Sequence, residues 1–106
     1  MNTFQEASLL RIFIDESDKL DGSPLYEIIL LKARELNLTG ATVIRGIAGF
    51  GAHNLIHTSK LLEMSHNLPV IIEIIDQKEN LEQLLSFLKG IVKEGLVTLQ
   101  DIKILK

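Results

Sequence analysis

Residues 41–62 read ATVIRGIAGFGAHNLIHTSKLL, and this stretch decides how the rest of the chain is arranged. It begins as a short apolar strand, passes through three glycines in six residues, and continues as a polar loop that contains histidine. The segments before and after it have the alternating and helical patterns of a scaffold. The loop is therefore the candidate functional segment.

Four strands are predicted from apolar alternation and β-branched content: residues 9–15, 41–45, 69–76 and 97–105. The third strand is apolar on both faces, so both of its faces require burial. The last strand changes its apolar phase between Leu99 and Ile102, which predicts a β-bulge near Gln100 and Asp101.

Two helices are predicted between these strands. The first runs from an N-cap at Ser23 to a stop at Gly40. The second begins at a capping box formed by Asp76 and Glu79 and ends at Gly95. Its apolar residues recur at helical spacing: Leu81, Leu84, Leu85, Leu88, Ile91 and Val92.

The order strand, helix, strand, strand, helix, strand predicts an α+β fold of the ferredoxin-like βαββαβ type. Its four-stranded antiparallel sheet would carry both helices on one face. Residues 1–106 form one domain in this interpretation, with residues 1–7 as an N-terminal extension and residues 47–68 as a long connection.

The uncovered face of this sheet is predicted to hold Leu9, Phe13, Ile71 and Ile75. A contiguous apolar patch of that kind exceeds what soluble monomers usually leave in water, which predicts a closed homo-oligomer, a trimer. Glu73 interrupts the third strand and would need a partner in such an interface. An ion pair between subunits is the interpretation favoured here.

Composition excludes several classes of protein. The chain has 106 residues, 46% hydrophobic and 24% charged, which is typical of a globular domain, and its aliphatic runs are too short to span a bilayer. It has no cysteine and its first residues lack a secretory pattern, so we expect a cytoplasmic protein. A net charge of −3 gives no general attraction to nucleic acid.

Arg45, Gly46, Gly49 and Gly51 are the first candidate ligand-binding residues. The pattern G-x-x-G-x-G follows a strand, and glycines allow backbone amides to approach an anion closely. Arg45 could present a planar fork to a phosphate or carboxylate. The pattern is not a P-loop, because Ala52 and the residue after it replace the required Lys and Ser or Thr. The alternative is a structural loop in which Arg45 pairs with an acidic neighbour.

His53, His57 and His66 suggest a metal, and the first two have the i, i+4 spacing of zinc ligands on a helix. No helix and no third ligand are evident, so no metal site is predicted. His57 also lies beside Thr58 and Ser59, a base next to hydroxyl groups. Because a catalytic triad is defined in space rather than by adjacency, no catalytic residue is predicted either.

Four runs in this order, ESDKLDGSPLYE, GATVIRGIAGFG, IHTSKLL and LPVIIEIID, resemble an uncharacterised branch of the PII-like signalling proteins, in the nitrogen regulatory PII-like superfamily. The resemblance covers almost the whole chain from Leu9 onward. It implies a ferredoxin-like subunit, a homotrimer, and a T-loop between the second and third strands. It also implies small effectors, commonly adenine nucleotides, in clefts between subunits.

The resemblance places six residues in or near the cleft: Arg45, Gly46, Gly49 and Gly51 at the loop base, and His57 and Thr58 further along the loop. Residues 93–98, KEGLVT, lack the glycine-rich basic loop that binds phosphates in nitrogen-regulatory PII proteins, which favours AMP or ADP over a triphosphate. The only tyrosine, Tyr26, lies outside the loop, so the uridylylation site of those proteins is missing.

The sequence therefore predicts a trimeric sensor that is not an enzyme, has no covalent cofactor, and signals through residues 47–62 to a membrane transporter or enzyme. An alternative is an interaction module that works without a small ligand. An enzyme that uses His57 or a loop-bound metal is a third, weaker alternative.

Overall fold

The computed structural model describes residues 1–51, 57–58 and 68–106. The main sheet is antiparallel throughout and has the strand order β4-β7-β1-β8. Its strands are β1 (Phe4–Asp15), β4 (Thr42–Arg45), β7 (Pro69–Asp76) and β8 (Leu96–Leu105), and its helices are α1 (Leu25–Glu35) and α2 (Lys78–Ile91). The predicted ferredoxin-like α+β fold is confirmed. Two short pairs, β2 (Lys19–Leu20) with β3 (Ser23–Pro24) and β5 (Ala48–Gly49) with β6 (His57–Thr58), are added to it.

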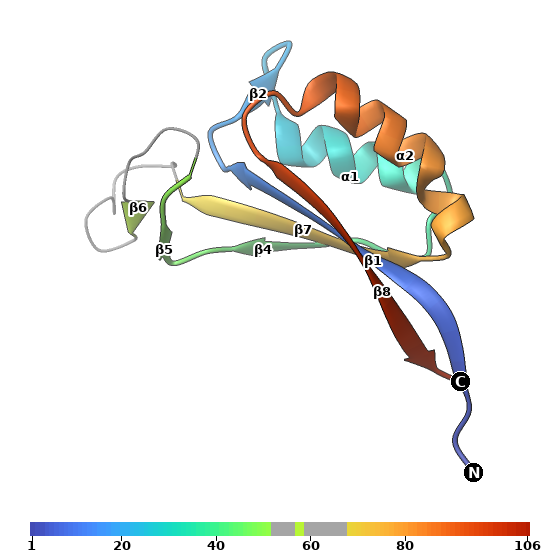
Figure 1. The fold of residues 1–106 in the computed structure, drawn as a ribbon. Helices are drawn as coiled ribbons and strands as arrows, with labels where there is room; N and C mark the ends of the chain where they lie inside the picture. Colours follow the sequence, from blue (N-terminus) through green and yellow to red (C-terminus); the bar gives the residue numbers. More distant parts are fainter. Residues whose placement is uncertain (52–56, 59–67) are drawn as a thin grey trace.

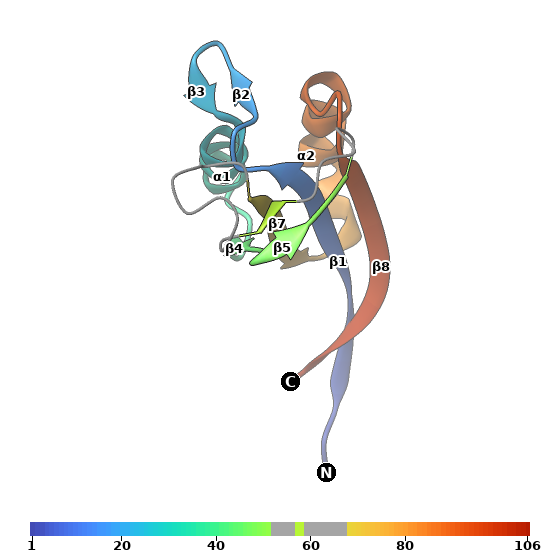
Figure 2. The same ribbon diagram turned by 90° about the vertical axis from the view of Figure 1, so that its left-hand side faces the viewer.

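Both helices cover the same face of the sheet (Figure 1). The core between these layers consists of aliphatic side chains with no exposed surface from the central strands and both helices: Leu10, Ile12, Ile72, Ile74, Ile29, Leu81 and Leu84. The helical spacing of the leucines in α2 and the alternation along β1 and β7 direct these residues inward. Neither of the described helices lies against the opposite side of the sheet, which we call the open face (Figure 2).

The start of α1 differs from the prediction. Asp21 and Gly22 have φ of 52° and 85°, and this left-handed pair forms the turn that joins β2 to β3. Ser23 therefore pairs with Leu20 as a strand residue instead of capping the helix. The helix ends at Glu35 rather than near Gly40, because Asn37 takes a left-handed φ of 59° and turns the chain away.

The predicted capping box at α2 is wrong, because Asp76 lies one residue before the N-cap and makes a different set of bonds. Its Oδ1 accepts from the Gln77 N–H at 2.7 Å and the Asn80 amide at 2.8 Å. Its Oδ2 accepts from the N–H and hydroxyl of Thr39 at 2.9 and 3.0 Å. Burial raises the pKa of Asp76, but these hydrogen bonds outweigh it and hold the pKa below its ordinary value. The carboxylate thus joins the start of α2 to the segment after α1.

Two predictions about the first and last strands of the sheet also differ from the structure. β1 begins at Phe4, so residues 4–7 belong to the sheet and are not an extension. Its pairing with β8 runs unbroken from Phe4 opposite Leu105 to Phe13 opposite Leu96, so there is no β-bulge at Gln100. The N-terminal half of β1 and the C-terminal half of β8 project beyond the helices as a two-stranded arm that carries both termini (Figure 1).

The open face holds the four apolar residues predicted for it, since Leu9 pairs with Ile75 and Phe13 with Ile71, out of phase with the core residues. Glu73 also has a partner within the same chain, since its Oε2 lies 2.8 Å from Arg11 Nε. An ion pair of Glu73 between subunits stays a prediction.

Asp76→Ala should lower the free energy of unfolding by about 1 to 3 kcal/mol, because it leaves several hydrogen-bond donors without their acceptor. Urea denaturation followed by circular dichroism measures this. Glu79→Ala is the matched control, since Glu79 is exposed, and it should change the value by less than about 0.5 kcal/mol.

The effect of Asp76 should also depend on pH. Because its folded pKa lies below the ordinary 3.8, its stabilisation is fully present above that value and is lost as the pH falls through the folded pKa. The stability difference between wild type and Asp76→Ala should therefore shrink in acid. A difference that stays constant down to the acid limit of folding would contradict this assignment.

Candidate functional site

The two ends of the long loop are held close together, the entry by the first residue of β7 and the exit by the residue that follows β1. The N–H of Gly46, at the loop entry, donates to the carbonyl of Pro69 at 2.7 Å. At the loop exit, the carbonyl of Leu68 accepts from the N–H of Glu16 at 2.8 Å. The loop therefore leaves and rejoins the sheet at one fixed place.

Two of the three glycines are required by close packing at this place. A Cβ on Gly46 would lie 2.8 Å from Pro69 Cγ and 3.3 Å from its carbonyl oxygen, and one on Gly49 would lie 3.2 Å from the same Cγ. Among the described residues, none lies within 4 Å of where a Cβ on Gly51 would stand. The glycine pattern thus has a structural cause at Gly46 and Gly49, and Gly51 is left for another explanation.

The predicted loop residues His57 and Thr58 form β6, which pairs with β5 so that Gly49 lies opposite His57 and Ala48 opposite Thr58. The structure describes the backbone of His57 and Thr58 and not their side chains. His53 and His66 lie outside the described residues. Whether the loop histidines bind a metal therefore stays untested. Among the described residues, no group of three metal-ligating side chains occurs.

A cavity of about 470 Å³ opens beside the loop base, which is within the usual range for small-molecule sites. One wall is the segment from Gly46 to Gly51, and the other is the connection between α2 and β8. The floor is formed by the ends of the central strands. Apolar side chains dominate the lining: Phe13, Ile14, Ala48, Phe50, Pro69, Val70, Ile71 and Leu96.

The described charges at the cavity are negative. Asp15 and Glu94 line it, and no lysine, arginine or histidine does so among the described residues. Gly95, which lies between Glu94 and Leu96, is held against β1, since a Cβ there would lie 2.6 Å from the carbonyl oxygen of Phe13. This wall therefore lies close against the sheet, but a phosphate would need positive charge from elsewhere.

Arg45 lies next to the cavity in sequence and outside it in space. Its Nη2 lies 2.7 and 2.8 Å from the two carboxylate oxygens of Glu16. Hydrogen bonding and attraction to this carboxylate raise the pKa of Arg45 above its ordinary value. Arg45 is paired with Val70, a core residue, so its side chain lies on the helix side of the sheet. This geometry matches the alternative in which Arg45 pairs with an acidic neighbour.

The structure thus brings Gly46, Gly49 and Gly51 to one cavity and aligns the backbone of His57 with Gly49. Sequence reasoning missed Pro69 and Phe50 as lining residues, and it treated Gly95 only as a helix stop. Pro69 had a signal, because it opens the third strand directly opposite the end of the second. The contact of Gly95 with β1 had none.

A family model described as "Uncharacterized ACR" (DUF190) matches residues 7–104. The chain belongs to the DUF190 family. It is 42% identical over 97 residues to a UPF0166 protein of Aquifex aeolicus, covering 92% of this chain and 91% of that protein. A UPF0166 protein of Methanocaldococcus jannaschii is 34% identical over 102 residues, covering 95% and 94%.

Solved PII-like structures share the fold of this DUF190 protein. CPII of Thiomonas intermedia K12, a nitrogen regulatory PII-like protein bound to ADP, AMP and bicarbonate, superposes with a TM-score of 0.75 over 96% of this chain and 91% of its own, at 17% identity. A PII-like signalling protein of Thermus thermophilus gives 0.70 over 95% and 91%, at 12% identity. The resemblance is confirmed at the level of the fold, which is that of PII-like proteins, and the family itself is an uncharacterised one. None of the described helices is long and apolar enough to cross a membrane.

Gly46→Ala should destabilise this DUF190 protein by about 1 to 3 kcal/mol, because its Cβ would overlap Pro69 and disturb the bond that closes the loop base. Thermal denaturation measures the loss. Gly51→Ala is the control and should leave the melting temperature unchanged, since no described residue lies within 4 Å of the added Cβ. Equal melting temperatures for both variants would contradict the assigned role of Gly46.

Proposed function

We propose that this chain is a PII-like regulatory protein, not an enzyme, that binds AMP or ADP between the subunits of a homotrimer. The observation that carries the proposal is the apolar cavity at the base of the long loop, with backbone of Gly46, Gly49 and Gly51 along one wall. A planar base fits a floor of aromatic and aliphatic side chains, and glycine amides suit an anionic or hydroxyl group.

The incomplete lining supports a site shared between copies. The cavity is bounded by the open face, since Phe13, Ile71 and Leu96 belong to both. It opens where a second subunit would stand if the open faces pack together. The positive charge that the described lining lacks would then come from that subunit.

The structural neighbours support the class of ligand. CPII has been solved with ADP and AMP, and its fold matches nearly the whole of this chain. For this chain the nucleotide is a proposal that rests on the shared fold and on the cavity at the base of the loop. The cytoplasm is the compartment proposed for such a sensor.

The loop at residues 47–62 would carry the signal. Gly46 and Gly49 belong both to the cavity wall and to the fastening of the loop on Pro69. A nucleotide that fits the cavity better in one arrangement of this wall would shift the population toward that arrangement, by no more than its difference in affinity. A membrane transporter or an enzyme is the proposed partner that reads the loop.

Isothermal titration with AMP, ADP, ATP and cyclic AMP tests the ligand. We expect binding of AMP or ADP and weaker binding of ATP. Ala48→Phe, which fills the cavity from an exposed position, should remove the binding while leaving the melting temperature unchanged. Absence of heat with every nucleotide, at protein concentrations where the oligomer is present, would overturn the proposed ligand.

Arg45→Ala tests the predicted role of the arginine. If Arg45 supplies positive charge to the phosphate, either directly or by leaving Glu16, AMP affinity should fall about tenfold to a hundredfold, whereas adenosine affinity should not change. Arg34→Ala, an exposed arginine on α1, is the control. Unchanged AMP affinity would remove Arg45 from the site and leave the glycine wall.

A second function is favoured by one observation. Ile47 and Phe50, beside the loop base, expose 79% and 73% of their surface, and exposed large apolar residues of this kind often dock a partner protein. An interaction module that works without a small ligand would keep its partner when nucleotide is removed and lose it in Ile47→Ser.

Catalysis by His57 is tested by nucleotide turnover, which His57→Ala would abolish.

A further inference from the structure

The open face has a regular pattern of rows across its strands. Residues directly opposite one another in neighbouring strands form each row and lie on the same face. One row is apolar on all four strands: Ile44, Ile71, Phe13 and Leu96. Ile44 and Leu96 expose 42% and 58% of their surface, and Phe13 and Ile71 between them are half-buried, so this row is a partly exposed apolar band across the sheet.

The next row is polar on all four strands: Thr42, Glu73, Arg11 and Thr98. Leu9 and Ile75 then form the core of a second apolar row, which ends at Gln100. The polar row is therefore enclosed by apolar residues on both sides, at a spacing of about 7 Å along the strands.

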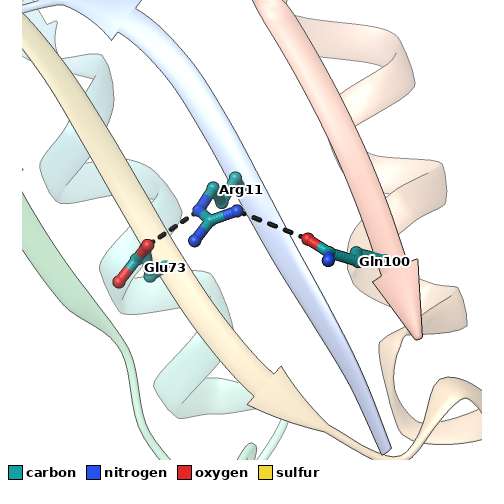
Figure 3. Close-up of polar contacts among 3 residues, drawn as sticks. All are labelled: Arg11, Glu73 and Gln100. Carbon is teal, nitrogen blue, oxygen red and sulfur yellow. Dashed lines mark hydrogen bonds and ion pairs between the residues drawn. The ribbon is translucent and has the colours of Figure 1, made fainter. Parts of the chain in front are cut away.

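An ion pair lies at the centre of the polar row. Arg11 on β1 contacts Glu73 on β7 at 2.8 Å and Gln100 on β8 at 3.5 Å (Figure 3). Among the described residues, Glu73 Oε1 and Arg11 Nη2 have no further partner. The two side chains are 31% and 38% exposed, so both still present hydrogen-bonding groups to the outside.

This combination selects one kind of partner. An anionic surface, such as nucleic acid or a lipid headgroup layer, would meet the negative charge of Glu73 and two uncharged apolar bands, so this face does not suit it. A second copy of this chain presents the same rows, and its Arg11 and Glu73 supply the opposite charge to each group. The charge pattern of the open face is thus complementary to itself.

We propose that open faces of neighbouring copies pack together and that the Arg11–Glu73 pair fixes their register by forming ion pairs across the contact. This inference rests on the proposed homo-oligomer and names its contact and specificity residues. A half-exposed ion pair contributes little to one copy alone. In a closed contact, any register that left either charge against an apolar row would be strongly disfavoured.

The test exchanges the two charges. Arg11→Glu with Glu73→Arg preserves the ion pair within each chain, so the variant should fold and assemble with itself. Mixed with wild type, it would place Arg against Arg and Glu against Glu across the contact. After subunit exchange with isotope-labelled wild type, native mass spectrometry should show mixed oligomers at least about tenfold below the statistical level.

Lys32→Glu with Glu35→Lys is the matched control, because it exchanges another ion pair, on α1 and away from the open face, and likewise leaves the net charge unchanged. It should mix statistically with wild type. Statistical mixing of the exchanged variant would overturn the register inference while leaving the homo-oligomer intact. A monomeric wild type at micromolar concentration would overturn the proposed oligomer, and this inference with it.

Discussion

The constraint on which this structure depends is that two helices can cover only one face of a four-stranded sheet. On the covered face, the aliphatic residues of β1 and β7 meet those of α1 and α2 and reach complete burial, as at Leu10, Ile72 and Leu84. This layer supplies most of the hydrophobic stabilisation of the chain. The other face consists of equally β-prone residues with nothing from the described chain against them, so the fold is complete in its connections and incomplete in its burial.

The candidate site lies where the covered and uncovered parts meet. Its floor is made by the ends of the central strands, which the core holds rigidly, while its walls are the loop base and the connection after α2. Pro69 fastens one wall through Gly46, and β1 fastens the other through Gly95. A ligand in this cavity would therefore contact backbone on two sides, and its remaining side would face a neighbouring copy. Burial of the ligand and burial of the open face would be completed by the same contact.

Sequence patterns predicted the fold because burial was periodic where the helices cover the sheet, as in the alternation of residues 69–76 and the leucines of α2. The patterns failed where the helices no longer cover the sheet and burial is no longer periodic. In the arm beyond the helices both faces of β8 stay partly exposed, so the shift between Leu99 and Ile102 reflected missing burial and not a bulge. The end of α1 was set by Asn37, whose left-handed backbone turns the chain before the predicted stop at Gly40.

The site was less predictable than the fold because its contacts join distant residues. The glycine pattern led correctly to the cavity wall, but the pairing of Arg45 with Glu16 spans 29 residues and depends on which face of β4 the arginine occupies. Strand alternation did contain that information, since Arg45 lies two residues after Val43, which packs against the core, and therefore shares its face of the strand. The α2–β8 connection lacks a glycine-rich basic loop, which predicted weak phosphate binding. The two carboxylates in the described lining agree with this.

The polar row explains how a chain can keep an apolar face without losing control of its assembly. A face of uniform aliphatic composition would bind other apolar surfaces in many registers, because the hydrophobic effect has no direction. Charged residues inside such a face penalise every arrangement that leaves them unpaired, at some loss of total affinity. Arg11 and Glu73 lie at the two central strands, where any face-to-face contact must pass over them. Their position therefore favours a discrete oligomer over open-ended association, and a discrete oligomer is what a cavity bounded by the open face requires.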